Sequence, residues 1–137
     1  MQPWTGWPLE RLLYLFVGAA YMMMWIQVSL FHWRGGFRSK FMWGPVLYTP
    51  LLFMAAFLMG FWHGGVLDTA YVVIFAIGTL EGMVGFILHA RGVASLVGGF
   101  NIRNLMAGPP IILPAMYMAM GVLGLLVFYW PQITGAR

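Results

Sequence analysis

Cysteine is absent from the 137 residues, and charged side chains make up only 7% of them. The missing cysteine excludes disulfide frameworks, thiolate metal sites and cysteine nucleophiles. Soluble domains carry about 25% charged residues. A chain this short cannot bury 62% hydrophobic residues away from water, because small domains leave much of their surface exposed. The sequence therefore predicts a protein surrounded by the lipid bilayer rather than by water.

Basic residues and catalytic motifs are also scarce. The seven Lys and Arg give a net charge of +4, and most of them lie between apolar segments. In that position they are expected to orient helices in a membrane, so no nucleic-acid partner is expected. The sequence has no phosphate-binding loop, no zinc-ligand helix and no nucleophile–base motif. We therefore expect no metal site and a role other than catalysis.

What the sequence does contain is four long apolar segments, at about residues 12–31, 41–62, 70–88 and 105–130. Each is near the ~20 residues that a helix needs to cross the hydrocarbon core. The first segment is too long for the apolar core of a cleavable signal, so we expect it to remain as a helix. The pattern predicts an all-α integral membrane protein, with residues 1–137 forming a single domain of four transmembrane helices.

The basic residues predict the orientation of these helices. Five of them lie in the two loops on one side: Arg34, Arg38, Lys40, Arg91 and Arg103. The other two, Arg11 and Arg137, lie toward the opposite side. Because cytoplasmic loops carry an excess of Lys and Arg, we expect both basic loops to be cytoplasmic and both termini to be outside. The expected location is the bacterial inner (cytoplasmic) membrane, crossed several times.

Short motifs recur in the two halves. His-x-Arg-Gly occurs as His32, Arg34 and Gly35, and again as His89, Arg91 and Gly92. Gly-Pro followed by a second proline five residues later occurs as Gly44, Pro45 and Pro50, and again as Gly108, Pro109 and Pro114. We interpret these matches as two tandem helical hairpins, over about residues 10–65 and 70–131. Two like-oriented hairpins predict a parallel internal repeat, with a pseudo-twofold axis along the membrane normal.

The repeated motifs have a mechanical interpretation. His and Arg in the last turn of a helix stabilise its negative end, and a following glycine, Gly35 or Gly92, is expected to adopt the left-handed cap. The Gly-Pro pairs are expected to begin the next helix, where proline needs no N–H. The second prolines, Pro50 and Pro114, are expected about one and a half turns inside their helices, where each frees a carbonyl and bends the helix.

The histidines suggest cofactor binding. If the two hairpins are a tandem repeat, His32 and His89 lie at equivalent cytoplasmic helix ends. Two imidazoles in such positions can ligate one haem iron. Arg34 and Arg91 would then lie near the haem propionates. In the alternative interpretation, both residues only cap helices and meet headgroups or water. His63 lies at the outer end of the second segment. It is either an interfacial residue beside an aromatic belt or the ligand of a chlorin magnesium.

Glu81 is the single acidic residue within the four segments. An ionisable group at this depth is costly and indicates a functional site. It can relay a proton, meet a substrate cation or pair with a charged residue of a partner chain, and in a transporter it would be the coupling carboxyl. Alternatively, it is a protonated carboxyl that bonds across a helix interface, where Gly78 and Gly82 allow a close approach.

Three functions follow from these features. The first is a non-catalytic accessory or scaffolding subunit of a larger bacterial membrane complex of the bioenergetic type, in contact with lipid, other subunits or copies of itself. The second is a small haem b or pigment-binding electron-transfer subunit that uses His32 and His89. The third is a small proton-coupled transporter that uses Glu81.

Overall fold

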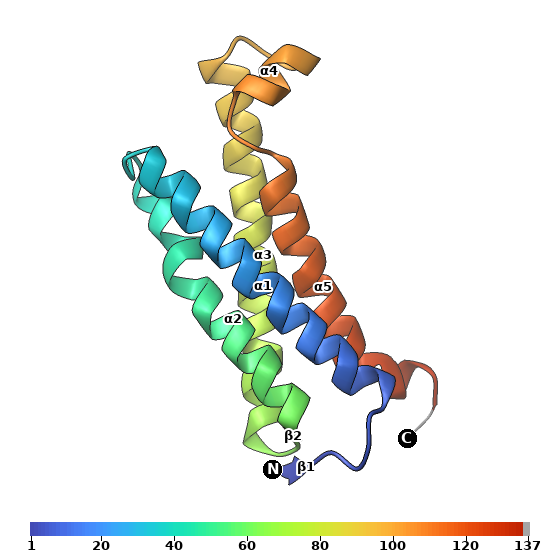
Figure 1. The fold of residues 1–137 in the computed structure, drawn as a ribbon. Helices are drawn as coiled ribbons and strands as arrows, with labels where there is room; N and C mark the ends of the chain where they lie inside the picture. The colour runs from blue at the N-terminus through green and yellow to red at the C-terminus, as the bar shows by residue number, and fades with distance from the viewer. Residues whose placement is uncertain (136–137) are drawn as a thin grey trace.

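The computed structural model describes residues 1–135, so the predicted outer residue Arg137 lies outside the described residues. Figure 1 shows a bundle of four long helices. They are α1 (Leu9–Arg34), α2 (Trp43–Phe61), α3 (Val66–Leu96) and α5 (Ile112–Ile133). The shorter elements are the strands β1 (Gln2–Pro3) and β2 (Trp62–His63), the 3₁₀-helix η1 (Lys40–Met42) and the helix α4 (Ile102–Ala107). All four long helices are long and apolar enough to cross a membrane, which confirms the predicted all-α class.

The long helices pack as two hairpins that lie against each other. α1 runs beside α2, and α3 runs beside α5 (Figure 1). The hairpins meet where α2 contacts α3 and where α1 contacts α5. Aromatic residues are prominent in the core between them, including Tyr14, Tyr21, Tyr71, Phe75 and Tyr117. Many large apolar side chains face outward instead, as expected of helices whose solvent is lipid.

Glycines bring the helices close together on both sides of α3. A Cβ added at Gly82 would lie 2.8 Å from the backbone nitrogen of Met118, so the backbones of α3 and α5 are in direct contact there. A Cβ added at Gly78 would lie 2.7 Å from Leu52 Cδ2 on α2. Gly78 therefore makes room for a side chain of α2, and Gly82 makes room for the backbone of α5.

The helix-end motif is realised differently in the two halves. His32 and Arg34 lie in the last turn of α1, but Gly35 has a right-handed φ of −77° and the left-handed residue is Gly36, at 68°. Gly92 is not a cap at all, because α3 continues to Leu96. A Cβ added at Gly92 would lie 2.8 Å from Pro109 Cγ, so this glycine makes room for the next segment. Gly35 is therefore the C-cap of α1, as predicted, but the predicted left-handed conformation at Gly35 and the predicted cap at Gly92 are wrong.

The two Gly-Pro pairs also differ. Gly44 and Pro45 lie in the first turn of α2. Gly108 instead ends α4, and α5 begins only at Ile112, which leaves Pro109 outside any helix. The cause is the Pro109–Pro110 pair, since a residue before proline is driven away from the helical region. Pro114 is consequently the third residue of α5, and the prediction that it lies one and a half turns inside is wrong.

Pro50 lies inside α2, as predicted, and the carbonyl that it frees is satisfied by another helix. Because proline has no N–H, the Val46 carbonyl loses its helical donor. The indole Nε1 of Trp25 on α1 donates to that carbonyl oxygen at 2.9 Å. The carbonyl freed by Pro50 is thus satisfied by α1, and this bond ties the first hairpin together.

This bond predicts the effect of Trp25→Phe. The variant keeps an aromatic ring but removes the donor to the Val46 carbonyl, and we expect the bundle to lose about 1 kcal/mol of stability. Thermal unfolding in detergent measures this change. Trp33→Phe is the matched control, because Trp33 lies on the same helix and is 73% exposed. Equal melting temperatures for the two variants would contradict the role assigned to the indole.

Candidate functional site

A polar network lies where the four long helices meet. It contains one residue from each: Tyr21 of α1, Thr49 of α2, Glu81 of α3 and Tyr117 of α5. Tyr21, Thr49 and Tyr117 are buried, and Glu81 is half-buried. Polar groups in such an interior must bond to one another because lipid offers no partners. We call these four residues the Glu81 network.

Tyr117 is the centre of the Glu81 network. Its hydroxyl donates to Glu81 Oε2 at 3.1 Å. The Thr49 hydroxyl lies 3.1 Å from the same phenol oxygen and also bonds the Pro45 carbonyl within its own helix. The Tyr21 hydroxyl donates to the backbone carbonyl of Tyr117 at 2.9 Å. One residue of α5 therefore links α2 and α3 through its hydroxyl and α1 through its backbone carbonyl.

The Glu81 carboxyl lies against the start of α2. A Cβ added at Gly44 would be 2.6 Å from Glu81 Oε1, so glycine leaves the space that the carboxyl occupies. The first turn of a helix is its positive end and favours a nearby anion. Across residues 1–135, no basic side chain forms an ion pair with Glu81. The carboxyl is therefore held by a hydroxyl and a helix end, without a compensating cation.

The hydroxyls of this network can serve both protonation states of Glu81. When the carboxyl is ionised, Tyr117 donates to it and Thr49 can donate to Tyr117. When it is protonated, the carboxyl can donate to Tyr117, which then donates to Thr49, and Thr49 donates to the Pro45 carbonyl. Each hydroxyl has one donor and two acceptor sites, so rotation of the O–H groups suffices. Proton binding thus reverses hydrogen bonds on three helices.

The structure places the predicted histidine pair together. The ring centroids of His32 and His89 are 6.5 Å apart. His89 Nδ1 lies 2.8 Å from the carbonyl oxygen of Pro110, which the missing N–H of Pro114 leaves free. His32 Nδ1 is buried and has no hydrogen-bond partner within residues 1–135.

The other predicted site residues stand apart from this pair. The Arg34 guanidinium stacks on the Phe31 ring, and Arg91 is exposed. His63 lies in β2 with its ring 4.5 Å from Trp4. No group of three or more His, Asp and Glu side chains within residues 1–135 is arranged to hold a metal ion.

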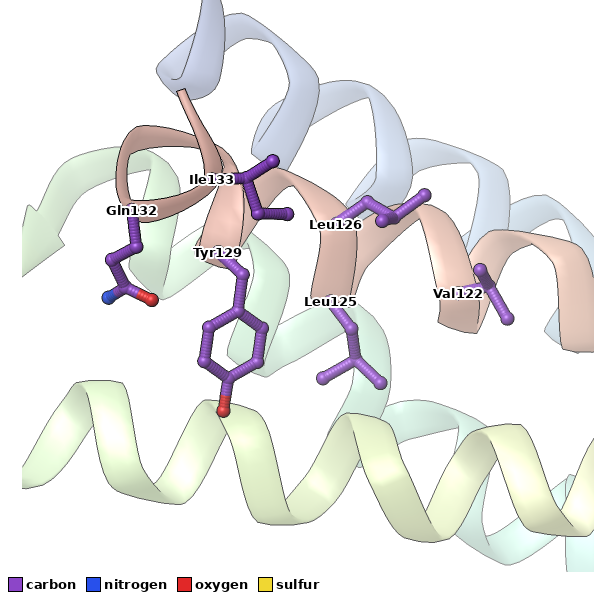
Figure 2. A pocket seen from close by; sticks show the side chains of 6 residues that line it. All are labelled: Val122, Leu125, Leu126, Tyr129, Gln132 and Ile133. Carbon is purple, nitrogen blue, oxygen red and sulfur yellow. The ribbon is translucent and has the colours of Figure 1, made fainter. Parts of the chain in front are cut away.

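An apolar hollow of about 490 Å³ lies along the C-terminal half of α5 (Figure 2). Six residues of α5 line it: Val122, Leu125, Leu126, Tyr129, Gln132 and Ile133. Figure 2 shows Leu125 and Tyr129 pointing toward the neighbouring helix α3. Because almost all of the lining is apolar, we expect lipid chains to fill this hollow.

Comparison with known proteins gives no further guide. No family model, curated protein or solved structure matches this chain. Evidence for the function therefore comes from the chemistry of the sites themselves.

Sequence reasoning found Glu81 but missed its partners. Tyr21, Thr49 and Tyr117 each carry a hydroxyl within an apolar segment, which is a detectable signal. Hydropathy alone does not say which way a helix is rotated, so it cannot show that three hydroxyls and one carboxyl converge.

Proposed function

We propose that this chain is a small proton-coupled membrane transporter in which Glu81 binds the proton. The observation that supports it is the Glu81 network, in which a membrane-embedded carboxyl accepts from Tyr117, a residue that also bonds α1 and α2. An ionisable residue at such a depth is usually part of a proton or ion pathway. Because the hydroxyls of the Glu81 network can serve both protonation states, Glu81 can bind and release a proton inside the assembled bundle.

Further polar groups extend from Glu81 toward both ends of the bundle. Glu81 and His89 are eight residues apart on α3, which places them near one face about two turns apart. Ser29 Oγ and His32 Nδ1 on α1 and the Tyr71 hydroxyl on α3 are buried, and they have no hydrogen-bond partner in the described part of the chain. Buried groups of this kind are suited to bind water, which relays protons. These groups support a proton path along the bundle axis.

Proton binding by Glu81 can be measured by infrared spectroscopy in lipid. We expect the wild-type chain to show a protonated carboxyl band that disappears as the pH rises and that is missing from Glu81→Gln. Glu10→Gln is the matched control and is expected to retain the band, because Glu10 lies at the outer end of α1. The proposal fails if the spectra of wild type and Glu81→Gln respond identically to pH.

The histidine pair favours a second candidate function, the binding of haem b. Two imidazoles with ring centroids 6.5 Å apart can approach one iron from opposite sides. The bond between His89 Nδ1 and the Pro110 carbonyl resembles the support that metal-ligating histidines receive. Purified protein incubated with haem, and then separated from unbound haem, should show a Soret band that His89→Ala lacks. The absence of that band in the wild type would exclude this candidate.

The expected accessory-subunit function depends on outward apolar faces, which every helix in lipid also has. It therefore stays a prediction. Copurification of other membrane chains in a mild detergent would support it, and so would a stable assembly of several copies.

A further inference from the structure

The outer end of the bundle contains a cavity of about 280 Å³ that combines aromatic rings with a carboxyl group. Its lining includes Trp4, Tyr14 and Phe128, together with Glu10 and His63. We call this space the outer cavity. It lies at the end of the bundle where β1, β2 and the start of α1 meet, away from the histidine pair at the end of α1.

The first residues of the chain build one wall of the outer cavity. β1 pairs with β2 in antiparallel register, with Gln2 opposite His63. The indole Nε1 of Trp4 donates to the Met59 carbonyl at 2.7 Å, which fixes the ring. The Trp4 ring then lies 4.5 Å from the His63 ring and 6.3 Å from the Tyr14 ring. The aromatic wall is therefore held in place by backbone pairing and by a hydrogen bond.

Glu10 is half-buried in the first turn of α1 and is not neutralised by its basic neighbour. Arg11 donates to the Gly60 and Gly6 carbonyls at 3.0 and 2.7 Å, and its guanidinium lies 3.8 Å from the centre of the Trp7 ring. Within residues 1–135, Glu10 forms no ion pair and no hydrogen bond with another side chain. Its carboxylate is therefore free to attract a cation into the cavity.

We propose that the outer cavity binds a small organic cation of the quaternary ammonium type. Aromatic faces attract such cations through their quadrupole, and a carboxylate supplies the opposite charge. Ca²⁺ fits less well, because it takes six to eight oxygen ligands and the cavity offers a single carboxylate. A trimethylammonium group has the size and the chemistry that this lining matches. The proposal depends on the outer cavity alone and not on the Glu81 network.

Calorimetric titration of the full chain in maltoside micelles tests the proposal. The ligand is choline chloride, and the neutral comparison is 3,3-dimethylbutan-1-ol, in which carbon replaces the charged nitrogen. Choline is expected to bind saturably at constant ionic strength, and the neutral alcohol at least about tenfold more weakly. Glycerophosphocholine, the soluble form of a lipid headgroup, separates the two sources of this chemistry. If glycerophosphocholine binds more tightly than choline, the natural ligand is a lipid headgroup. If choline binds more tightly, the natural ligand is a free solute.

Two pairs of variants identify the residues responsible. Glu10→Gln keeps the shape of the side chain and is expected to weaken choline binding about tenfold. Asp68→Asn removes the other outer acidic charge, but its amide oxygen can still accept the Gly64 N–H, so binding should be unchanged. Trp4→Leu should weaken binding roughly two- to fivefold, whereas Trp130→Phe should not.

The following results would overturn the proposal. One is that the neutral alcohol binds as well as choline. Another is that Glu10→Gln binds choline like the wild type. The third is that Asp68→Asn weakens choline binding as much as Glu10→Gln does. Melting temperatures of all four variants show whether each remains folded.

Discussion

In proteoliposomes, Glu81→Gln is expected to lower potential-driven proton uptake at least about tenfold while leaving the four helices assembled. Glutamine has nearly the same shape, and its amide oxygen can still accept the Tyr117 hydroxyl. It cannot release or bind a proton at neutral pH. The variant therefore removes the proton-binding step and retains the bond that joins α3 to α5.

Vesicles loaded with a pH-sensitive dye measure this effect under a potassium gradient with valinomycin. Protein-free vesicles give the background, and Glu10→Gln controls for loss of an acidic residue elsewhere on the chain. Two results would contradict the proposed function: proton uptake by Glu81→Gln at the wild-type rate, or wild-type uptake no faster than the background.

The second large effect is expected from Gly82→Ala. The added Cβ would lie 2.8 Å from the Met118 nitrogen and 2.9 Å from its Cα, so it meets backbone rather than a movable side chain. α3 and α5 would have to separate, and we expect a loss of roughly 1–3 kcal/mol. This loss must exceed the gain in helix propensity that alanine brings over glycine.

Gly85→Ala is the matched control for that substitution. It gains the same helix propensity on the same helix, but its Cβ would lie 3.3 Å from Pro114 Cβ, a contact that a small shift relieves. Thermal unfolding in detergent should show Gly82→Ala melting well below wild type, with Gly85→Ala close to it. If both variants melt alike, the backbone contact at Gly82 does not determine the packing of α3 on α5.

The membrane-spanning helices could be predicted from the sequence because lipid imposes length and hydrophobicity on them. The residues at which these helices end could not be predicted from the sequence. Arg91 marks the end of an apolar run, yet α3 continues past it to Leu96, since a charged residue beyond the hydrocarbon does not stop a helix. The His-x-Arg-Gly motif predicts that Gly92 caps a helix, but in the structure this glycine accommodates Pro109. These features depend on contacts with other segments, which a local motif does not encode.

In the candidate sites too, single residues could be predicted from the sequence, whereas their contacts with other segments could not. The depth of Glu81 in an apolar segment predicted its importance, but the convergence of Tyr21, Thr49 and Tyr117 on it depends on helix rotation. Trp4 and Glu10 were not predicted to share a cavity, because that requires β1 to pair with a segment about 60 residues away. The tandem repeat and the cytoplasmic location of the Arg-bearing loops stay predictions.

The contact between backbones at Gly82 and Met118 also has a mechanical meaning. No side chain stands between α3 and α5 at this point, so no change of rotamer can let one slide along the other. The two helices are expected to shift as a rigid unit. The first hairpin, in contrast, meets that unit through exchangeable hydroxyl bonds, so any pivot in the molecule is expected at the seam between the hairpins.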